Sequence, residues 1–218
     1  MRHLKRVAPC LAVIGVFGLA ATPALAGLPE FSPPGGIPFT STSGKSTLET
    51  VSKIKVTCKA DTNHGELTGP KSLIITVTFT GCESKLILCN SPNGLPGEII
   101  TPVLSGTIGY LVNPEVKEVG VDLFSPTGAP VAEFLCGAAL RAVVSGSVIG
   151  KITPVNKLLV PPKHFTLTFK QKKGKQAITH LFAEPMDVLM ASFGGPPEEA
   201  GLASTDQLSF VAPVEVKA

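Results

Sequence analysis

The stretch LIITVTFTGCESKLILC, Leu73–Cys89, decides the fold class of this chain. Apolar side chains occupy every second position from Leu73 to Phe79, and threonines occupy the alternate positions from Thr76 to Thr80. This period of two is typical of a β-strand that buries one face and exposes the other. The stretch therefore predicts a core strand that runs into a short segment bounded by Cys82 and Cys89.

Similar short runs continue through the rest of the chain. The range 164–170 alternates in the same way, with Phe165, Leu167 and Phe169 on the inward side. No window keeps a period of 3.6 residues, and only Glu198 to Ser204 could form a helical turn. We therefore predict an all-β fold, either an antiparallel β-sandwich or a partly closed barrel of about 10–13 short strands. Candidate strands are 48–51, 54–59, 73–80, 85–88, 107–112, 119–124, 132–136, 140–149, 164–170, 179–182, 188–193 and 208–214.

The N-terminus has the pattern of a secretory signal peptide. Three basic residues, Arg2, Lys5 and Arg6, precede an apolar run that ends near the small-x-small sequence Ala24-Leu25-Ala26. The run is shorter than the roughly 20 residues that a transmembrane helix needs. We predict export, cleavage after Ala26, a secreted or cell-envelope location, and no transmembrane span in the mature chain.

Removing residues 1–26 makes the chain neutral. The full chain has 19 Lys and Arg, and without the three basic residues of the leader 16 remain against 16 Asp and Glu. A neutral chain offers no electrostatic reason to bind nucleic acid or an anionic membrane. Nucleic acid is therefore not an expected partner.

Four cysteines remain after removal of Cys10 with the leader, and an exported chain is expected to pair them in two disulfides. Cys58 and Cys136 share the inward side of their predicted strands, whereas Cys82 and Cys89 flank a short segment. Of the three possible connectivities, this favours Cys58 with Cys136 and Cys82 with Cys89.

The domain organisation expected after the leader is simple. Residues 27–45 are rich in Pro, Gly, Ser and Thr, which predicts an extended leader segment. Residues 46–218 are predicted to form a single all-β domain.

Two polar motifs resemble known sites only superficially. Ser43-Gly44-Lys45-Ser46 lacks the earlier glycine of a phosphate-binding loop, because Phe39 stands there, and is interpreted as a flexible entry to a strand. The sequence Asp61-Thr62-Asn63-His64-Gly65-Glu66 lacks the remaining ligands of a calcium loop and is interpreted as a tight turn.

Histidine and lysine provide the other candidates. His64, His164 and His180 do not form the close pairs of zinc sites and are expected on the surface. A basic cluster surrounds Gly174 and is interpreted as an exposed hairpin tip, with an anionic polymer as the alternative partner; it consists of Lys170, Lys172, Lys173 and Lys175. Five acidic residues could balance this cluster: Glu184, Asp187, Glu198, Glu199 and Asp206. No catalytic residue, cofactor or metal ligand is predicted.

Five segments together resemble a family of exported, uncharacterised actinobacterial proteins. They are GELTGPK, TFTGCES, GEIITPVLSGTIGY, FLCG and SGSVIGKITPVN, and the last one, with the cysteine pattern, is the most specific. The resemblance extends from about Phe39 to the C-terminus. It implies a shared architecture and transfers no catalytic residue.

The sequence thus favours a non-enzymatic exported β-domain that acts as a binding or structural module at the cell envelope or outside the cell. A small apolar-ligand carrier is the first alternative, because 44% of the residues are hydrophobic and a barrel could hold a cavity. An exported hydrolase whose site assembles only in space is the second.

Overall fold

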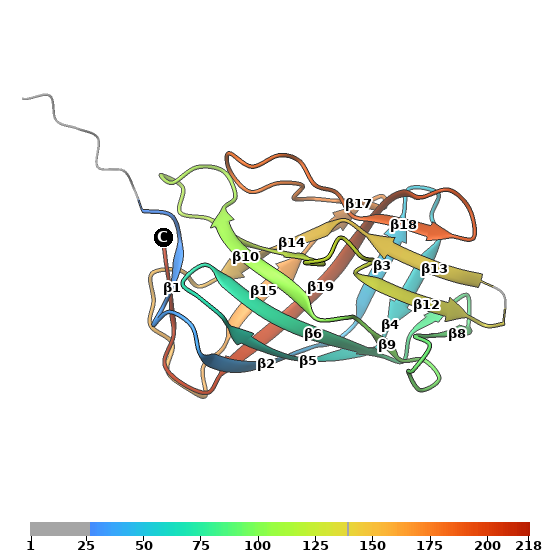
Figure 1. Cartoon of the computed structure of the whole chain (residues 1–218), viewed down its shortest axis with the longest axis horizontal. Helices are drawn as coiled ribbons and strands as arrows, with labels where there is room; N and C mark the ends of the chain where they lie inside the picture. Colours follow the sequence, from blue (N-terminus) through green and yellow to red (C-terminus); the bar gives the residue numbers. More distant parts are fainter. Residues whose placement is uncertain (1–26, 139) are drawn as a thin grey trace, which may run out of the picture.

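The structure is a computed structural model that describes residues 27–138 and 140–218. These residues form twenty β-strands and no helix, which confirms the all-β prediction (Figure 1). The strands are β1 (Glu30–Ser32), β2 (Ile37–Ser43), β3 (Ser46–Thr50), β4 (Lys55–Cys58), β5 (Ala60–Leu67), β6 (Ser72–Thr80), β7 (Glu83–Ser84), β8 (Ile87–Asn90), β9 (Ile99–Ile100), β10 (Leu104–Tyr110), β11 (Val119–Phe124), β12 (Ala132–Cys136), β13 (Leu140–Ser145), β14 (Ser147–Thr153), β15 (Phe165–Phe169), β16 (Gln171–Lys172), β17 (Lys175–Gln176), β18 (Met190–Phe193), β19 (Glu198–Phe210) and β20 (Glu215–Lys217).

Eight antiparallel strands close into a barrel. Their order is β19-β2-β5-β6-β10-β11-β14-β15, and β15 pairs with β19 to complete the circle. Closure pairs every strand on both sides and leaves no free sheet edge in the barrel wall. Of the two architectures that the sequence left open, the barrel is the one adopted.

A second ring is built on the same long strand. Residues of β19 that precede the barrel segment pair with β3 on one side and with β18 on the other. The order β19-β3-β4-β7-β8-β12-β13-β18 returns to β19, so β19 belongs to both closures. Figure 1 shows the barrel and the second ring side by side, with β19 crossing between them.

Short interruptions mark the points where the chain crosses from one closure to the other. Lys59 separates β4 from β5, and Gly146 separates β13 from β14. Gly146 has φ +86°, and a Cβ there would lie 2.1 Å from the carbonyl oxygen of Val188, so only glycine fits this position. The range 140–149, predicted as one strand, is therefore two.

The side chains follow the alternation that the sequence predicted for β6 and β15. Leu73, Ile75 and Val77 of β6 are buried, and so are the three alternate residues Phe165, Leu167 and Phe169 of β15. These residues join one continuous hydrophobic core with the inward residues of the other strands.

Small elements cover the ends and the outside of the two closures. β1 pairs with β20 beside one end of the barrel, where Phe31 and Val216 are buried (Figure 1). The β16–β17 hairpin, with Lys173 and Gly174 at its turn, packs on β19 near Gly201. The hairpin predicted for the basic cluster is thus confirmed.

Several predicted elements differ from the structure. The range 179–182 contains no strand, and Glu198 to Ser204 is the first half of β19 and not a helical turn. Residues 27–45, expected as an extended leader, contain β1 and β2, and β2 lies in the barrel wall between β5 and β19. Residues 85–88 form a strand only from Ile87, because Lys85 and Leu86 make the β7–β8 turn.

The predicted disulfide connectivity is wrong. The bonds join Cys58 to Cys82 and Cys89 to Cys136. Each bond links neighbouring strands: Cys82 directly precedes β7, which pairs with β4 at Thr57, and Cys136 is opposite Cys89 in the β12–β8 ladder. Spacing along the chain could not show which strands become neighbours.

In the described residues, the disulfides lie beside three of the four shortest ladders of the second ring. β4 and β7 share one residue pair, and β7–β8 and β8–β12 share two each. The two bonds fasten the β7–β8 hairpin to the strands on either side. They also indicate an oxidising compartment.

No helix in the described residues is long and apolar enough to cross a membrane. The predicted signal peptide, residues 1–26, lies outside the described residues.

Candidate ligand-binding cavity

An internal cavity of about 110 Å³ extends through the barrel and the second ring. Its wall is largely apolar, and both closures contribute to it: Ile75, Leu104, Leu123, Val148 and Leu167 belong to the barrel, and Leu48, Val56, Phe134, Val144 and Leu202 to the second ring. Because residues of both closures line so small a volume, the cavity is narrow and elongated.

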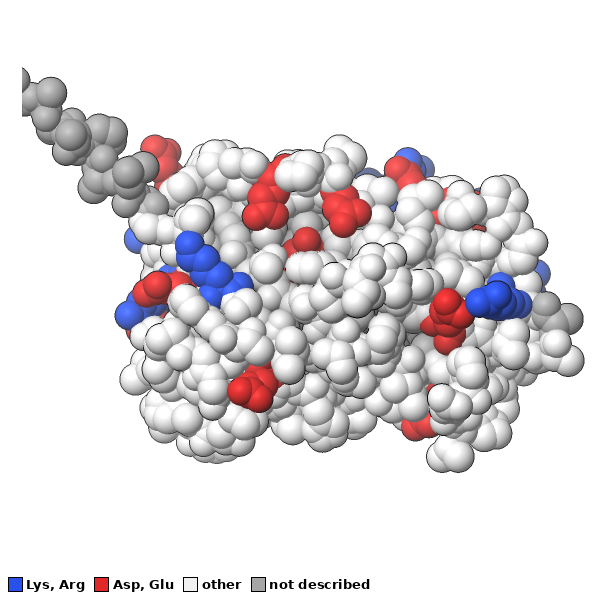
Figure 2. Space-filling model, in the orientation of Figure 1, with Lys and Arg blue, Asp and Glu red and all other residues white. Residues whose placement is uncertain are grey.

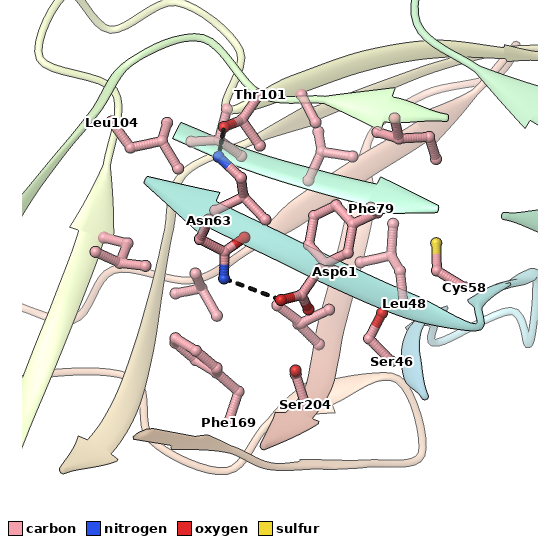
Figure 3. Close-up of a pocket in the computed structure, with 18 of the residues that line it drawn as sticks. Ser46, Leu48, Cys58, Asp61, Asn63, Phe79, Thr101, Leu104, Phe169 and Ser204 are labelled. Carbon is pink, nitrogen blue, oxygen red and sulfur yellow. Dashed lines mark hydrogen bonds between the residues drawn. The ribbon is translucent and has the colours of Figure 1, made fainter. Parts of the chain in front are cut away.

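A polar cluster interrupts this apolar wall at the junction of the two closures (Figure 3). We define the junction cluster as Ser41 of β2, Asp61 and Asn63 of β5, and Ser204 and Asp206 of β19. Each of these residues is buried and lines the cavity. The three strands are neighbours in the order β5-β2-β19, so their inward residues meet.

The alternation of each strand sets the position of the cluster. On β19 the inward residues run Leu202, Ser204, Asp206, Leu208 and Phe210, so the polar pair lies between apolar residues on both sides. β5 similarly directs Asp61, Asn63 and Leu67 inward and exposes Thr62, His64 and Glu66.

Asn63 is the centre of the hydrogen-bond network. Its Nδ2 lies 2.6 Å from Ser41 Oγ, 2.9 Å from Asp61 Oδ1 and 3.2 Å from Asp206 Oδ1. Ser204 Oγ donates to Asp206 Oδ2 over 2.9 Å, and Ser43 Oγ donates to Asp61 Oδ2. Figure 3 shows Asn63 and Asp61 beside each other among apolar side chains such as Leu104, Phe79 and Phe169.

Both carboxyl groups are buried. Burial first, and then the negative charge of Asp61, raise the pKa of Asp206 to about 7, against a hydrogen bond from Ser204 that lowers it. None of the four ion pairs in the described part of the chain involves Asp61 or Asp206. The cluster is thus rich in hydrogen-bond acceptors and has no cation of its own.

Aromatic packing closes the barrel beyond the cluster. Phe39 and Phe165 lie with their ring centroids 5.2 Å and 5.7 Å from that of Phe210. Phe39 pairs with Gly65 across β2 and β5, and a Cβ on Gly65 would lie 2.3 Å from the Phe39 ring. Gly65 is therefore needed for close packing of an aromatic ring, and not for a turn.

The predicted tight turn at Asp61–Glu66 is wrong, since the whole segment is strand β5. Polar residues on the inward face resembled turn residues in the sequence. The signal that identifies them is their parity with the buried Leu67. Ser43 and Ser46, from the loop-like motif, also end near the junction: Ser46 lines the cavity and Ser43 donates to Asp61.

The other candidates lie on the outside. His64, His164 and His180 are exposed, as predicted. Lys175 forms an ion pair with Glu199, so one of the five acidic residues that could balance the basic cluster does so. Asp206, another of the five, instead lines the cavity. Figure 2 shows charged side chains in small separate groups and no broad basic area on the face that it displays.

A partly buried acid, Asp122, lies on the outer wall of the barrel. Burial, with Asp187 and Glu184 nearby, raises the pKa of Asp122 to about 6, although the neighbouring Ser147 acts to lower it. In the described residues no group of three or more His, Cys, Asp and Glu side chains could hold a metal ion. Asp122 thus provides a partly buried carboxyl group that does not line the cavity.

Comparisons with protein-family models, curated proteins and solved structures found no match. The likeness to exported actinobacterial proteins stays a prediction from the sequence.

Proposed function

We propose that the chain is an exported, non-enzymatic β-domain that binds a small apolar ligand inside its closed barrel, at the cell envelope or outside the cell. The observation that carries the proposal is the largely apolar cavity that extends through the barrel and the second ring. An eight-stranded barrel is either filled by its own side chains or able to hold one small ligand. The space that the core leaves supports the second case.

The volume limits the size of the ligand. A cavity of about 150 Å³ lined by aliphatic and aromatic side chains accepts benzene. About 110 Å³ therefore suits a ligand of about five to seven non-hydrogen atoms, and its narrow form favours an unbranched chain. Export is supported by the sequence of residues 1–26 and by the two disulfides.

Filling the cavity tests this function. The Ile75→Phe substitution places a larger side chain on the cavity wall, whereas Ile74→Phe makes the same change at the next residue, which is exposed. Titration calorimetry of the mature protein with 1-hexanol should give a Kd on the order of 0.1–1 mM for wild type. We expect Ile74→Phe to bind equally well and Ile75→Phe to lose binding at least about tenfold, because the introduced ring occupies the ligand space.

Equal binding by both variants would place the alcohol outside the cavity. Far-ultraviolet circular dichroism of both variants should show the wild-type strand content, so that lost binding reflects the cavity and not unfolding. No binding of hexanol, hexane or benzene to wild type would remove the proposed function.

A further inference from the structure

The junction cluster has more hydrogen-bond acceptors than its donors can satisfy. The Asn63 amide nitrogen carries two hydrogens, yet three oxygens lie within 3.2 Å of it: Ser41 Oγ, Asp61 Oδ1 and Asp206 Oδ1. Both carboxyl groups use their second oxygen to accept from a serine. A donor from outside the chain would complete this network.

An independent observation also indicates a missing donor. Asn63 is 3% exposed, lines the cavity, and its Oδ1 has no hydrogen-bond partner among the described residues. A buried carbonyl oxygen without a partner destabilises the folded protein, because the lost hydrogen bond to water is not replaced. Figure 3 shows the amide nitrogen of Asn63 directed at Asp61 and the amide oxygen on the other branch of the amide group.

The charge of the cluster selects the kind of donor. Two buried carboxyl groups without a paired lysine or arginine favour a cation over a neutral hydroxyl group, and they disfavour an anion. A primary ammonium group offers three donors, which match the unpartnered oxygen of Asn63 and the two Oδ1 atoms of Asp61 and Asp206 that share the Asn63 amide nitrogen. The apolar wall on either side suits an alkyl chain attached to that group.

Resting on the proposed function, we infer that the cavity binds a short, unbranched primary alkylamine, whose ammonium group donates to Asn63, Asp61 and Asp206 and whose chain lies along the apolar wall. The recognition is by charge and by donated hydrogen bonds together. A ligand that has only one of these properties binds more weakly.

Three probes of seven non-hydrogen atoms each separate these contributions at pH 7.5: hexylammonium, 1-hexanol and pentanoate. Calorimetric titration of the mature protein should give at least about tenfold tighter binding for hexylammonium than for 1-hexanol. Pentanoate should show no binding.

Three variants test which residues cause the preference for hexylammonium over 1-hexanol. Asp206→Asn should lower hexylammonium affinity about tenfold or more and change hexanol affinity less than about threefold. Asp122→Asn removes a partly buried carboxyl group that does not line the cavity and should leave both affinities unchanged. Asn63→Leu, which removes the unpartnered oxygen, should reduce the amine preference as well.

The outcomes distinguish the inference from the function on which it rests. Equal affinity for amine and alcohol, or an amine preference that survives in Asp206→Asn, would overturn the ammonium site while leaving the apolar cavity intact. Binding of none of the three probes, nor of hexane, would remove the cavity function itself. If Asp206→Asn does not fold, the comparison of hexylammonium with 1-hexanol on wild type still decides.

Discussion

Asp206 gives the protein a definite dependence of stability on pH. Its pKa is raised from 3.8 to about 7 in the folded protein, so the folded state binds more protons than the unfolded state between these pH values. The favourable contribution is complete below about pH 4 and is lost as the pH rises through 7. The loss is at most about 4 kcal/mol, at 1.36 kcal/mol for each pKa unit.

We therefore expect wild type to be more stable at pH 5 than at pH 8, and Asp206→Asn to have a much smaller difference. Urea unfolding at pH 5 and pH 8 measures the difference in the free energy of unfolding. Glu198→Gln is the control, because the pKa of the exposed Glu198 is lowered, chiefly by its hydrogen bond with Ser52, and its effect on stability has the opposite sign. The same pH dependence in wild type and Asp206→Asn would exclude Asp206 as the cause.

The candidate site could be predicted from the sequence only in part. LASTDQLSF, residues 202–210, shows Leu202, Leu208 and Phe210 at alternate positions, and Asp206 shares their parity. That pattern is enough to place Asp206 on an inward face. It cannot show that Asp61 and Asn63 lie opposite, because this depends on the strand order β5-β2-β19.

Among the strands, strict alternation of apolar and polar residues was the most reliable predictor of strand bounds. The ranges predicted for β11 and β12 match the observed strands, and those for β6 and β15 match within one residue at each end. β5 was not predicted as a strand because its inward residues Asp61 and Asn63 are polar. The acidic start of β19 resembled a helical turn. Residues 179–182 are apolar in part but pack as a loop, with Leu181 buried beside Gly109.

The β7–β8 hairpin contains a strained residue that can be relieved. Lys85 and Leu86 both have positive φ, as a two-residue type I′ turn requires, and Leu86 has φ +69° and is 87% exposed. Leu86→Gly should stabilise the protein by about 0.5–1 kcal/mol, since the left-handed conformation costs a side-chain-bearing residue roughly 1–2 kcal/mol and glycine very little. Urea unfolding with the disulfides intact measures the change.

Leu88→Gly provides the matched control two residues away. Leu88 is half-exposed in β8, where glycine weakens a strand, so this variant should lose about 1 kcal/mol. Destabilisation by both substitutions to a similar extent would show that Leu86 makes contacts that outweigh its backbone strain.

The barrel and the second ring differ in the interactions that stabilise them. The barrel has long ladders, such as the eight residue pairs of β5 with β6, whereas the second ring depends on disulfides near its one-pair and two-pair ladders. Replacing Cys58 and Cys82, or Cys89 and Cys136, with alanine should cost about 3–4 kcal/mol in each case by the loop-entropy estimate. The loss of local stability should be larger in the second ring than in the barrel.

Hydrogen exchange tests that contrast. In the variant without the Cys89–Cys136 bond, amides of β7, β8 and β12 should exchange faster, while those of β5 and β6 keep their protection. Uniform loss of protection would contradict the view that the disulfide stabilises the second ring while the long ladders stabilise the barrel. Mass spectrometry of non-reduced peptides checks the pairing, and a Cys58–Cys136 peptide would contradict the structure.

The strand that both closures share also sets the order in which they can form. β19 follows every other strand of the barrel and of the second ring in the sequence, and each ring lacks a neighbour until β19 is in place. A nascent chain that has emerged only as far as β18 therefore holds two open sheets with unpaired edges, which are prone to pair with other chains. Arrival of one segment, Glu198–Phe210, closes both sheets and brings Asp206 to Asn63, so the completion of the fold and of the candidate site is a single late event in the life of the chain.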